Sequence, residues 1–222
     1  MFKLDHLVIN IDECYQKDKK YISKIVEAGF PYEPSFGKGT RGFKVSNIWI
    51  GNEYFEMVNI LKQEGGGWIE SWTNLYNNGH RGLVCLMIDT NSLDKIYDIF
   101  KNRNINISKP EFLKFKWFFN LFMRTMPWRN SYVNFFEGIP LQIGLQEMKD
   151  DKSRKFMEEY MVPNSIDNEI LGIEKIIVKG PITTNDIELI KKIFKEYIIR
   201  DFPLTMTLDN NQTLIFKEDK AN

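Results

Sequence analysis

Three segments combine aromatic residues with glycine or arginine, a composition typical of ligand clefts. In the first, the glycines of 65–67 are followed by Trp68 and Trp72. Three glycines supply a hinge, and tryptophans beyond it suit a lid over a hydrophobic pocket. The alternative interpretation is a linker whose tryptophans pack on the neighbouring sheet. The segment is therefore a candidate either for gating a cleft or for joining two units.

The other two aromatic segments follow one another along the chain. Residues 112–124 are rich in phenylalanine and include Trp117, which predicts a strand with one face lining a pocket. A core strand or a dimer surface fits the same pattern. Arg124 and Trp128 bracket the next segment, and an arginine beside an aromatic at a strand end can clamp a carboxylate or phosphate. These segments predict a partly apolar ligand with one polar or anionic end. The candidate binding residues are Trp68, Trp72, Trp117, Arg124 and Trp128.

Several chemistries lack their usual sequence motifs. There is no P-loop, HExxH or GxSxG pattern, so we expect neither a nucleotide cofactor nor a serine-hydrolase site. The two cysteines, Cys14 and Cys85, are too few for a disulfide framework or a cysteine-only zinc site. Free thiols in a reducing cytosol are the expectation.

Net charge and composition limit the classes of partner that this protein is expected to have. The chain has 222 residues, with 30 Lys+Arg and 30 Asp+Glu, and a net charge of zero argues against a nucleic-acid partner. No apolar run approaches the roughly 20 residues that span a bilayer, so no membrane partner is expected. The charged residues near Met1 do not resemble a signal peptide, and we expect a cytoplasmic location.

Hydrophobic periodicity predicts a strand–helix–strand unit that occurs more than once. The first unit consists of a strand over 4–11, a helix over 17–28, strands over 43–50 and 54–61 joined by a turn at Gly51–Asn52, and room for one more short strand. The second consists of a strand over 82–89, a helix over 92–102 and strands over 114–126, 131–136 and 140–146. A shorter third unit has strands over 173–178, 204–208 and 213–217 and a helix over 185–197.

The order of these units resembles the vicinal oxygen chelate superfamily, which comprises glyoxalase, bleomycin-resistance and dioxygenase proteins. The residues carrying the resemblance are Leu4–Asp12, Gly39–Thr40, Tyr54–Val58 and Trp128–Gln142 with Tyr132–Phe136. The resemblance implies an α+β fold in which two βαβββ modules, at about 3–62 and 80–148, form a curled mixed sheet around a cleft. The expected domains are a glyoxalase-like domain over 1–148, a connecting segment over 149–168 and a C-terminal βαββ extension over 169–222.

The resemblance also implies a set of site residues. In metal-dependent members, ligands come from the first and last strands of each module, which here selects His6, Glu56, Leu83 and Gln142. His6, Glu56 and Gln142 could hold one divalent ion of Fe, Mn, Ni or Zn, but leucine cannot ligate. His80 is an alternative fourth ligand. Without a metal, His6 and Glu56 form either an acid/base couple, which makes them the candidate catalytic residues, or a structural ion pair.

Three functions are compatible with these features. The first is a glyoxalase-like lyase, isomerase or dioxygenase-type enzyme acting on a small molecule in the cleft, with His6 or Glu56 as base. The second is a metal-free protein that binds or sequesters a small molecule, as drug-resistance members of the superfamily do. The third is an interaction module using the aromatic second half, with a homodimer as one form. The fold alone supports both chemistry and binding and does not decide between them. Leu83 favours the second function over a four-ligand metalloenzyme, because leucine cannot ligate a metal.

Overall fold

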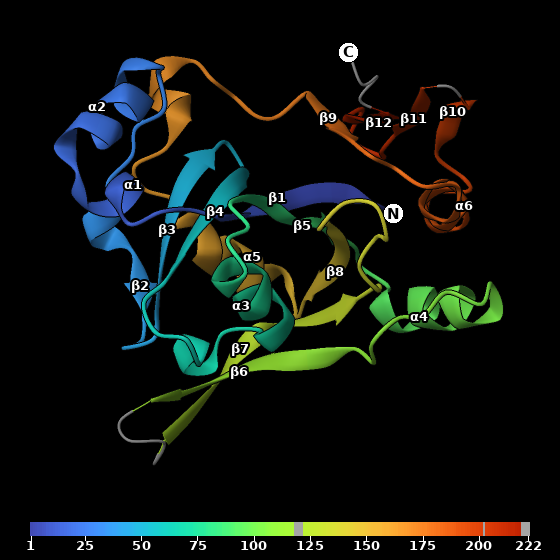
Figure 1. Ribbon diagram of the computed structural model, residues 1–222, viewed down its shortest axis with the longest axis horizontal. Coiled ribbons are helices and arrows are strands. Elements are labelled where there is room, and N and C mark those ends of the chain that lie inside the picture. Colours follow the sequence, from blue (N-terminus) through green and yellow to red (C-terminus); the bar gives the residue numbers. More distant parts are fainter. Residues whose placement is uncertain (118–121, 202, 219–222) are drawn as a thin grey trace.

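A computed structural model describes residues 1–117, 122–201 and 203–218, and the side chains of 115–124 lie outside that description. Figure 1 shows a large sheet, with helices on both sides of it, and a second, smaller sheet formed by the C-terminal part. None of the helices in the described ranges has the length and apolar character required to cross a membrane.

The first module contains the predicted hairpin and helix. Its elements are β1 (Lys3–Asn10), α1 (Cys14–Lys17), α2 (Lys19–Glu27), the 3-10 turn η1 (Pro34–Phe36), β2 (Lys38–Gly39), β3 (Phe43–Ile50) and β4 (Glu53–Ile60). Gly51 has φ of 65° in the turn between β3 and β4, a conformation that glycine adopts without strain. Gly37, Gly39 and Gly42 have the spacing of a dinucleotide-binding loop, but they precede strand β3 instead of the helix N-terminus that would bind phosphate.

The second module keeps the predicted order of elements and differs in its strand limits. Its elements are β5 (Gly82–Asp89), α4 (Leu93–Asn102), β6 (Glu111–Trp117), β7 (Phe122–Tyr132) and β8 (Gln142–Met148). The predicted single strand over 114–126 is wrong, because β6 and β7 pair as an antiparallel hairpin. The predicted strand over 131–136 is also wrong beyond Val133, because β7 ends at Tyr132 and the chain then bends back towards β8.

The two modules join through their first strands. The sheet order is β2-β3-β4-β1-β5-β8-β7-β6, with β1 and β5 antiparallel at its centre. In each module the first strand also pairs in parallel with the last, β1 with β4 and β5 with β8. This arrangement confirms the predicted pair of βαβββ modules that share one curled mixed sheet.

The two faces of this sheet have different surroundings. We call the face carrying Val8 and Cys85, which pair across the centre, the inner face. The linker between the modules, with the 3-10 turn η2 (Gly65–Gly67) and helix α3 (Glu70–Asn77), packs on it. The outer face carries Leu7 and Leu86 and supports the main core. Alternation along each strand therefore decides which residues reach the cleft.

The C-terminal part forms a complete third module. A connection with helix α5 (Asp151–Glu158) and the 3-10 turn η3 (Ser165–Asn168) leads to β9 (Lys175–Gly180), α6 (Thr184–Ile193), β10 (Ile198–Asp201), β11 (Leu204–Thr207) and β12 (Thr213–Glu218). The order β10-β11-β12-β9 repeats that of the first module, and β10 is one strand more than the predicted extension. Thr183 and Asp186 form a capping box at the start of α6.

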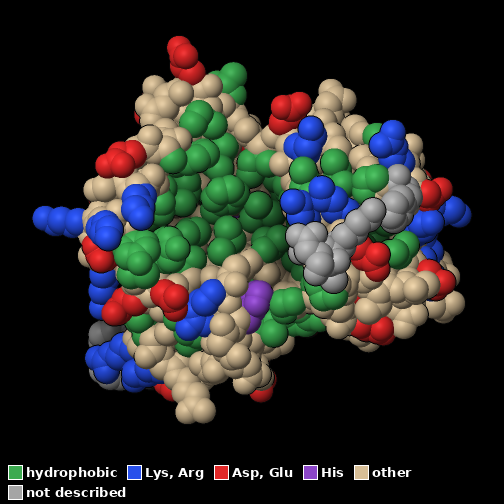
Figure 2. All heavy atoms as spheres, turned by 45° about the horizontal axis from the view of Figure 1, so that its top comes forward, with side chains coloured by type: hydrophobic (Ala, Val, Ile, Leu, Met, Phe, Trp, Pro, Cys, Tyr) green, Lys and Arg blue, Asp and Glu red, His purple; other side chains and the backbone are tan. Residues whose placement is uncertain are grey.

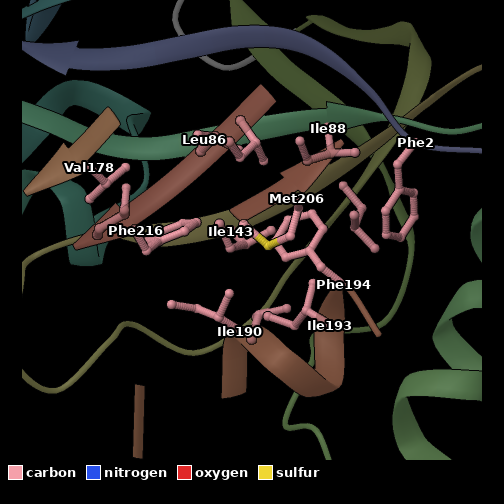
Figure 3. Packing of buried hydrophobic residues seen from close by; sticks show 14 of the residues in the cluster. Phe2, Leu86, Ile88, Ile143, Val178, Ile190, Ile193, Phe194, Met206 and Phe216 are labelled. Carbon is pink, nitrogen blue, oxygen red and sulfur yellow. The ribbon is translucent and has the colours of Figure 1, made fainter. Parts of the chain in front are cut away.

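The largest core lies between the outer face and this third module. It joins Leu86, Ile88 and Ile143 of the large sheet to side chains of α6, β11 and β12, as Figure 3 shows. Phe194 and Met206 are fully buried in it. Elsewhere, Figure 2 shows a broad hydrophobic surface between the side of the molecule that carries α2 and the side that carries the third module.

Candidate functional site

Strand pairing places His6 and Glu56 on the inner face of neighbouring strands. In the parallel β1–β4 ladder, His6 lies opposite Tyr54 and Val8 lies opposite Glu56. On the other side of β1, Met87 of β5 lies opposite His6. Since side chains alternate along a strand, all these residues point to the same side of the sheet. The structure therefore brings the two predicted catalytic residues together, in a position that is largely shielded from solvent, with His6 5% exposed.

His6 lies between two carboxylates. Its Nδ1 is 3.2 Å from Oδ2 of Asp5, and its Nε2 is 3.8 Å from Oε2 of Glu56. The imidazole also stacks on the ring of Tyr54, with the centroids 4.5 Å apart. A carboxylate only accepts hydrogen bonds, so the tautomer of His6 with the proton on Nδ1 would donate to Asp5 and leave Nε2 towards Glu56. The arrangement can pass a proton between Glu56 and His6 after a small side-chain movement.

Burial shifts the acid–base behaviour of this cluster. It raises the pKa of the Glu56 carboxyl above its usual range, and although His6 opposes that shift, the charge of Asp5 adds to it. Burial also raises the pKa of Tyr54 far above its ordinary value, so its phenol stays neutral. Glu56 thus holds its proton to a higher pH than an exposed glutamate, as general acids in enzymes do.

A polar network connects this cluster to the second module. Gln146 of β8 donates from Nε2 to Oδ2 of Asp5 over 2.6 Å. On β7, Asn130 lies opposite Gln146 and donates from Nδ2 to the hydroxyl of Tyr132 over 2.9 Å. The inner face therefore carries hydrogen-bonding side chains from both modules.

The other positions considered for metal ligands, Gln142, Leu83 and His80, make contacts of other kinds. Gln142 accepts from Nε1 of Trp72 over 2.8 Å and donates from Nε2 to the carbonyl of Val133 over 2.7 Å. A register shift in the β1–β5 ladder pairs Leu83 with Ile9, and Leu83 packs against the core on the outer face. His80 contacts the carbonyl of Leu83 through Nε2.

These contacts do not fit a metal centre. A catalytic divalent site usually has three protein ligands and an open position. Here His6 and Glu56 remain, while both polar atoms of the Gln142 amide are already hydrogen-bonded. Within the described ranges, no group of three or more His, Cys, Asp or Glu side chains could hold a metal ion.

The structure also locates the predicted binding residues. Trp72 is 2% exposed and Trp68 is partly buried, and both pack with Val8 and Cys85 on the inner face. This arrangement corresponds to the linker interpretation of the segment. Trp128 lies at a pocket, whereas the side chains of Trp117 and Arg124 lie outside the described residues.

A pocket with a cavity volume of about 80 Å³ lies beside the His6 cluster, between the inner face and α5. Helix α5 is held against the sheet by Arg154, whose Nη2 is 2.8 Å from Oδ1 of Asp89. The pocket is lined by Asp5, Asn52, Tyr54, Trp128, Gln146, Met148, Arg154, Met157, Glu158 and Met161. His6 and Glu56 are not part of this lining, and Tyr54 links the two features because it lines the pocket and stacks on His6.

Most of the pocket was not predicted from the sequence. We interpreted residues 149–168 as a connection with a short helix ending before Pro163 and assigned no site to it, yet Arg154, Met157 and Met161 recur at helical spacing and all line the pocket. That periodicity was the available signal. Tyr54 lies two residues from Glu56 and could have been found by strand alternation, whereas alternation would place Asp5 opposite His6 and misses the irregularity in β1 between Leu4 and His6.

Comparison with solved structures supports the fold. A hypothetical protein from Staphylococcus aureus matches 100% of this chain and 87% of its own length, at 14% identity and a TM-score of 0.67. Methylmalonyl-CoA epimerases from Streptomyces coelicolor and Mycobacterium tuberculosis match 67% and 68% of this chain and 98% and 90% of their own, both at 10% identity and a TM-score of 0.47. No protein-family model and no curated protein matches the sequence.

The strand order and pairing show two βαβββ modules side by side in one curled mixed sheet, which is the glyoxalase-like fold that the resemblance implied. Because the epimerase TM-scores lie below 0.5, nothing about substrate follows from those matches.

Proposed function

We propose that this protein binds a small, partly apolar molecule in the pocket between the inner face and α5, without a metal ion. The observation that carries the proposal is the origin of the pocket lining. Asp5 and Tyr54 come from the first module, Trp128 and Gln146 from the second, and Met157 from α5. Concave sites that mix apolar walls with a few polar groups are the usual form of small-molecule sites.

The metal-free form of the proposal rests on the inner face. Gln142 uses its amide to hold Trp72 and the Val133 carbonyl, so ligating a metal through Gln142 would break a buried hydrogen bond. Leu83 packs against the core on the other face. Binding of a small molecule without a metal leaves the contacts of both Gln142 and Leu83 in place.

Binding of benzyl alcohol, a neutral molecule with an apolar ring and a polar end, tests this function. Saturation-transfer NMR in EDTA should detect the ring protons on the wild type. Met157→Trp, which fills the pocket, should abolish the signal, while Phe156→Trp places the same side chain at an exposed position of the same helix and should retain it. Binding only after Fe, Mn, Ni or Zn is added, or equal binding by both variants, would overturn the proposal.

A second function, acid–base catalysis on the bound molecule, is favoured by the raised pKa of Glu56 beside His6. It ranks second because neither residue lines the pocket in this structure, and Tyr54 would have to move to expose them. Exchange of the α-protons of phenylacetone in D₂O tests it. Exchange above the buffer rate that is lost in Glu56→Gln supports catalysis, and no exchange above that rate removes it.

A further inference from the structure

We propose that the pocket beside α5 selects a protonated amine carried on an apolar body. This inference deepens the proposed binding function and rests on it. It depends on three features of the pocket: its charged groups, the polar atoms left without partners, and the character of its walls.

The charged groups at the pocket leave an excess of negative charge. Asp5 and Glu158 contribute carboxylates to the lining, and Arg154 contributes a guanidinium. Arg154 is paired with the carboxylate of Asp89, which is mostly buried behind it. A charge so paired is largely neutralised, and it attracts an anionic ligand much less than a free arginine does. The two remaining carboxylates favour a cation.

The polar atoms left over beside the pocket accept hydrogen bonds. Within the described residues, both contacts of Asp5 end at Oδ2, which leaves Oδ1 as an acceptor. Gln146 uses its Nε2 to donate to Asp5, so its amide oxygen remains. A ligand that donates several hydrogen bonds fits this set, and an ammonium group donates up to three.

The walls suit the rest of such a ligand. Trp128 provides an aromatic ring, whose face attracts cations, whereas the ring of Tyr54 already packs on His6 and Trp49. Met148, Met157 and Met161 provide flexible, polarisable side chains that adapt to an apolar body. The pocket therefore combines a carboxylate, leftover acceptors and an aromatic surface within one site.

The charged residues at the pocket do not favour a ligand with an anionic end, which the sequence analysis had included as a possibility. The pocket holds a single described arginine, Arg154, and Asp89 already pairs with it. Arg129, next to Trp128, is bound by Asp94 and Glu147. The side chain of Arg124 lies outside the described residues, and the inference makes no use of it.

Three probes of similar size separate the possibilities: benzylammonium, benzyl alcohol and benzoate. Their affinities would be measured by calorimetry at pH 7 in EDTA. We expect benzylammonium to bind about tenfold tighter than benzyl alcohol, and benzoate to bind weakest. Asp5→Asn, which keeps the size of the side chain, should lower the affinity ratio of benzylammonium to benzyl alcohol from about tenfold towards one.

A second pair of variants guards against misfolding. Asp5 contacts His6 and Gln146, so its variant is checked by circular dichroism. Glu158→Gln changes an exposed carboxylate of the lining and should weaken benzylammonium about two- to threefold. Glu159→Gln changes the neighbouring exposed carboxylate, which does not line the pocket, and should have no effect.

Each outcome has a separate meaning. A benzylammonium preference that depends on Asp5 or Glu158 supports the inference. Tighter or equal binding of benzyl alcohol retains the binding function and overturns the amine preference, as does tightest binding of benzoate. If no probe binds, the proposed function fails together with the inference.

Discussion

The side chains of the inner face are divided between a buried acid–base cluster and a pocket lining. His6 contacts Asp5 and Glu56 and stacks on Tyr54, while Asp5 and Tyr54 also line the pocket. His6 and Glu56 could be predicted from the resemblance, because the family pattern selects those two positions. The engagement of Gln142 by Trp72 could not, since it depends on where the linker folds back on the sheet.

The raised pKa of Glu56 predicts a pH-dependent effect on stability. A group whose pKa is higher in the folded state favours folding at low pH, and that contribution is lost as pH rises through the folded pKa. Glu56→Gln should therefore become steadily more stable relative to wild type as pH rises from about 4 towards neutrality. Urea unfolding across this range checks it, with the exposed Glu159→Gln as control. A constant difference at all pH values would contradict it.

The two linker tryptophans provide a matched test of one hydrogen bond. Trp72→Phe removes the donor to Gln142 and leaves a buried acceptor unpaired, which should cost about 1–2 kcal/mol beyond the loss of packing. Trp68→Phe removes an indole nitrogen that is buried without a partner among the described residues, so it should cost about 1 kcal/mol less. Urea denaturation measures both, and equal costs would show that the Gln142 contact contributes nothing.

At the scale of elements, helix α5 provides one wall of the pocket, and the β6–β7 hairpin extends the sheet. The helix itself was predicted from its periodicity, but its position was not, because its ion pair to Asp89 joins residues far apart in the chain. The hairpin was mistaken for one strand because residues 112–126 contain no glycine or proline to indicate an end. Strand-forming side chains alone do not locate a turn.

The Arg154–Asp89 pair predicts how firmly α5 is attached. Arg154→Gln should raise amide hydrogen exchange across 151–158, because it leaves the buried Asp89 carboxylate without its cation. Lys155→Gln removes the neighbouring exposed charge of the same helix and should leave exchange unchanged. Mass spectrometry of deuterated protein measures both, and unchanged exchange in Arg154→Gln would mean that other contacts hold the helix.

For the molecule as a whole, the main feature is that a third module shares the core of the first two. The sequence indicated a third unit, and in the structure Thr183 caps its helix. Its edge strand β10 was not predicted, because Ile198–Asp201 is short and largely exposed and so lacks a clear hydrophobic pattern. Hydrophobic pattern can indicate a unit without indicating what it packs against.

This shared core predicts that the modules unfold together. All five tryptophans precede residue 149, so tryptophan fluorescence reports on the first two modules only. Phe194→Ala, in the fully buried part of the third module, should nevertheless lower the stability measured by fluorescence by about 3–5 kcal/mol. Ile199→Ala, at an exposed position, should change it by less than about 0.5 kcal/mol. An unshifted fluorescence transition in Phe194→Ala would show that the third module unfolds independently.

The most direct test of a metal-free site is elemental analysis of protein purified without a histidine tag, on wild type and His6→Ala. The inner face predicts no stoichiometric Fe, Mn, Ni or Zn in either sample, because Gln142 is committed to Trp72 and Leu83 packs on the opposite face. Circular dichroism of His6→Ala confirms that the variant is folded. Near-stoichiometric metal in the wild type that disappears in folded His6→Ala would contradict the account and establish a metal centre at His6.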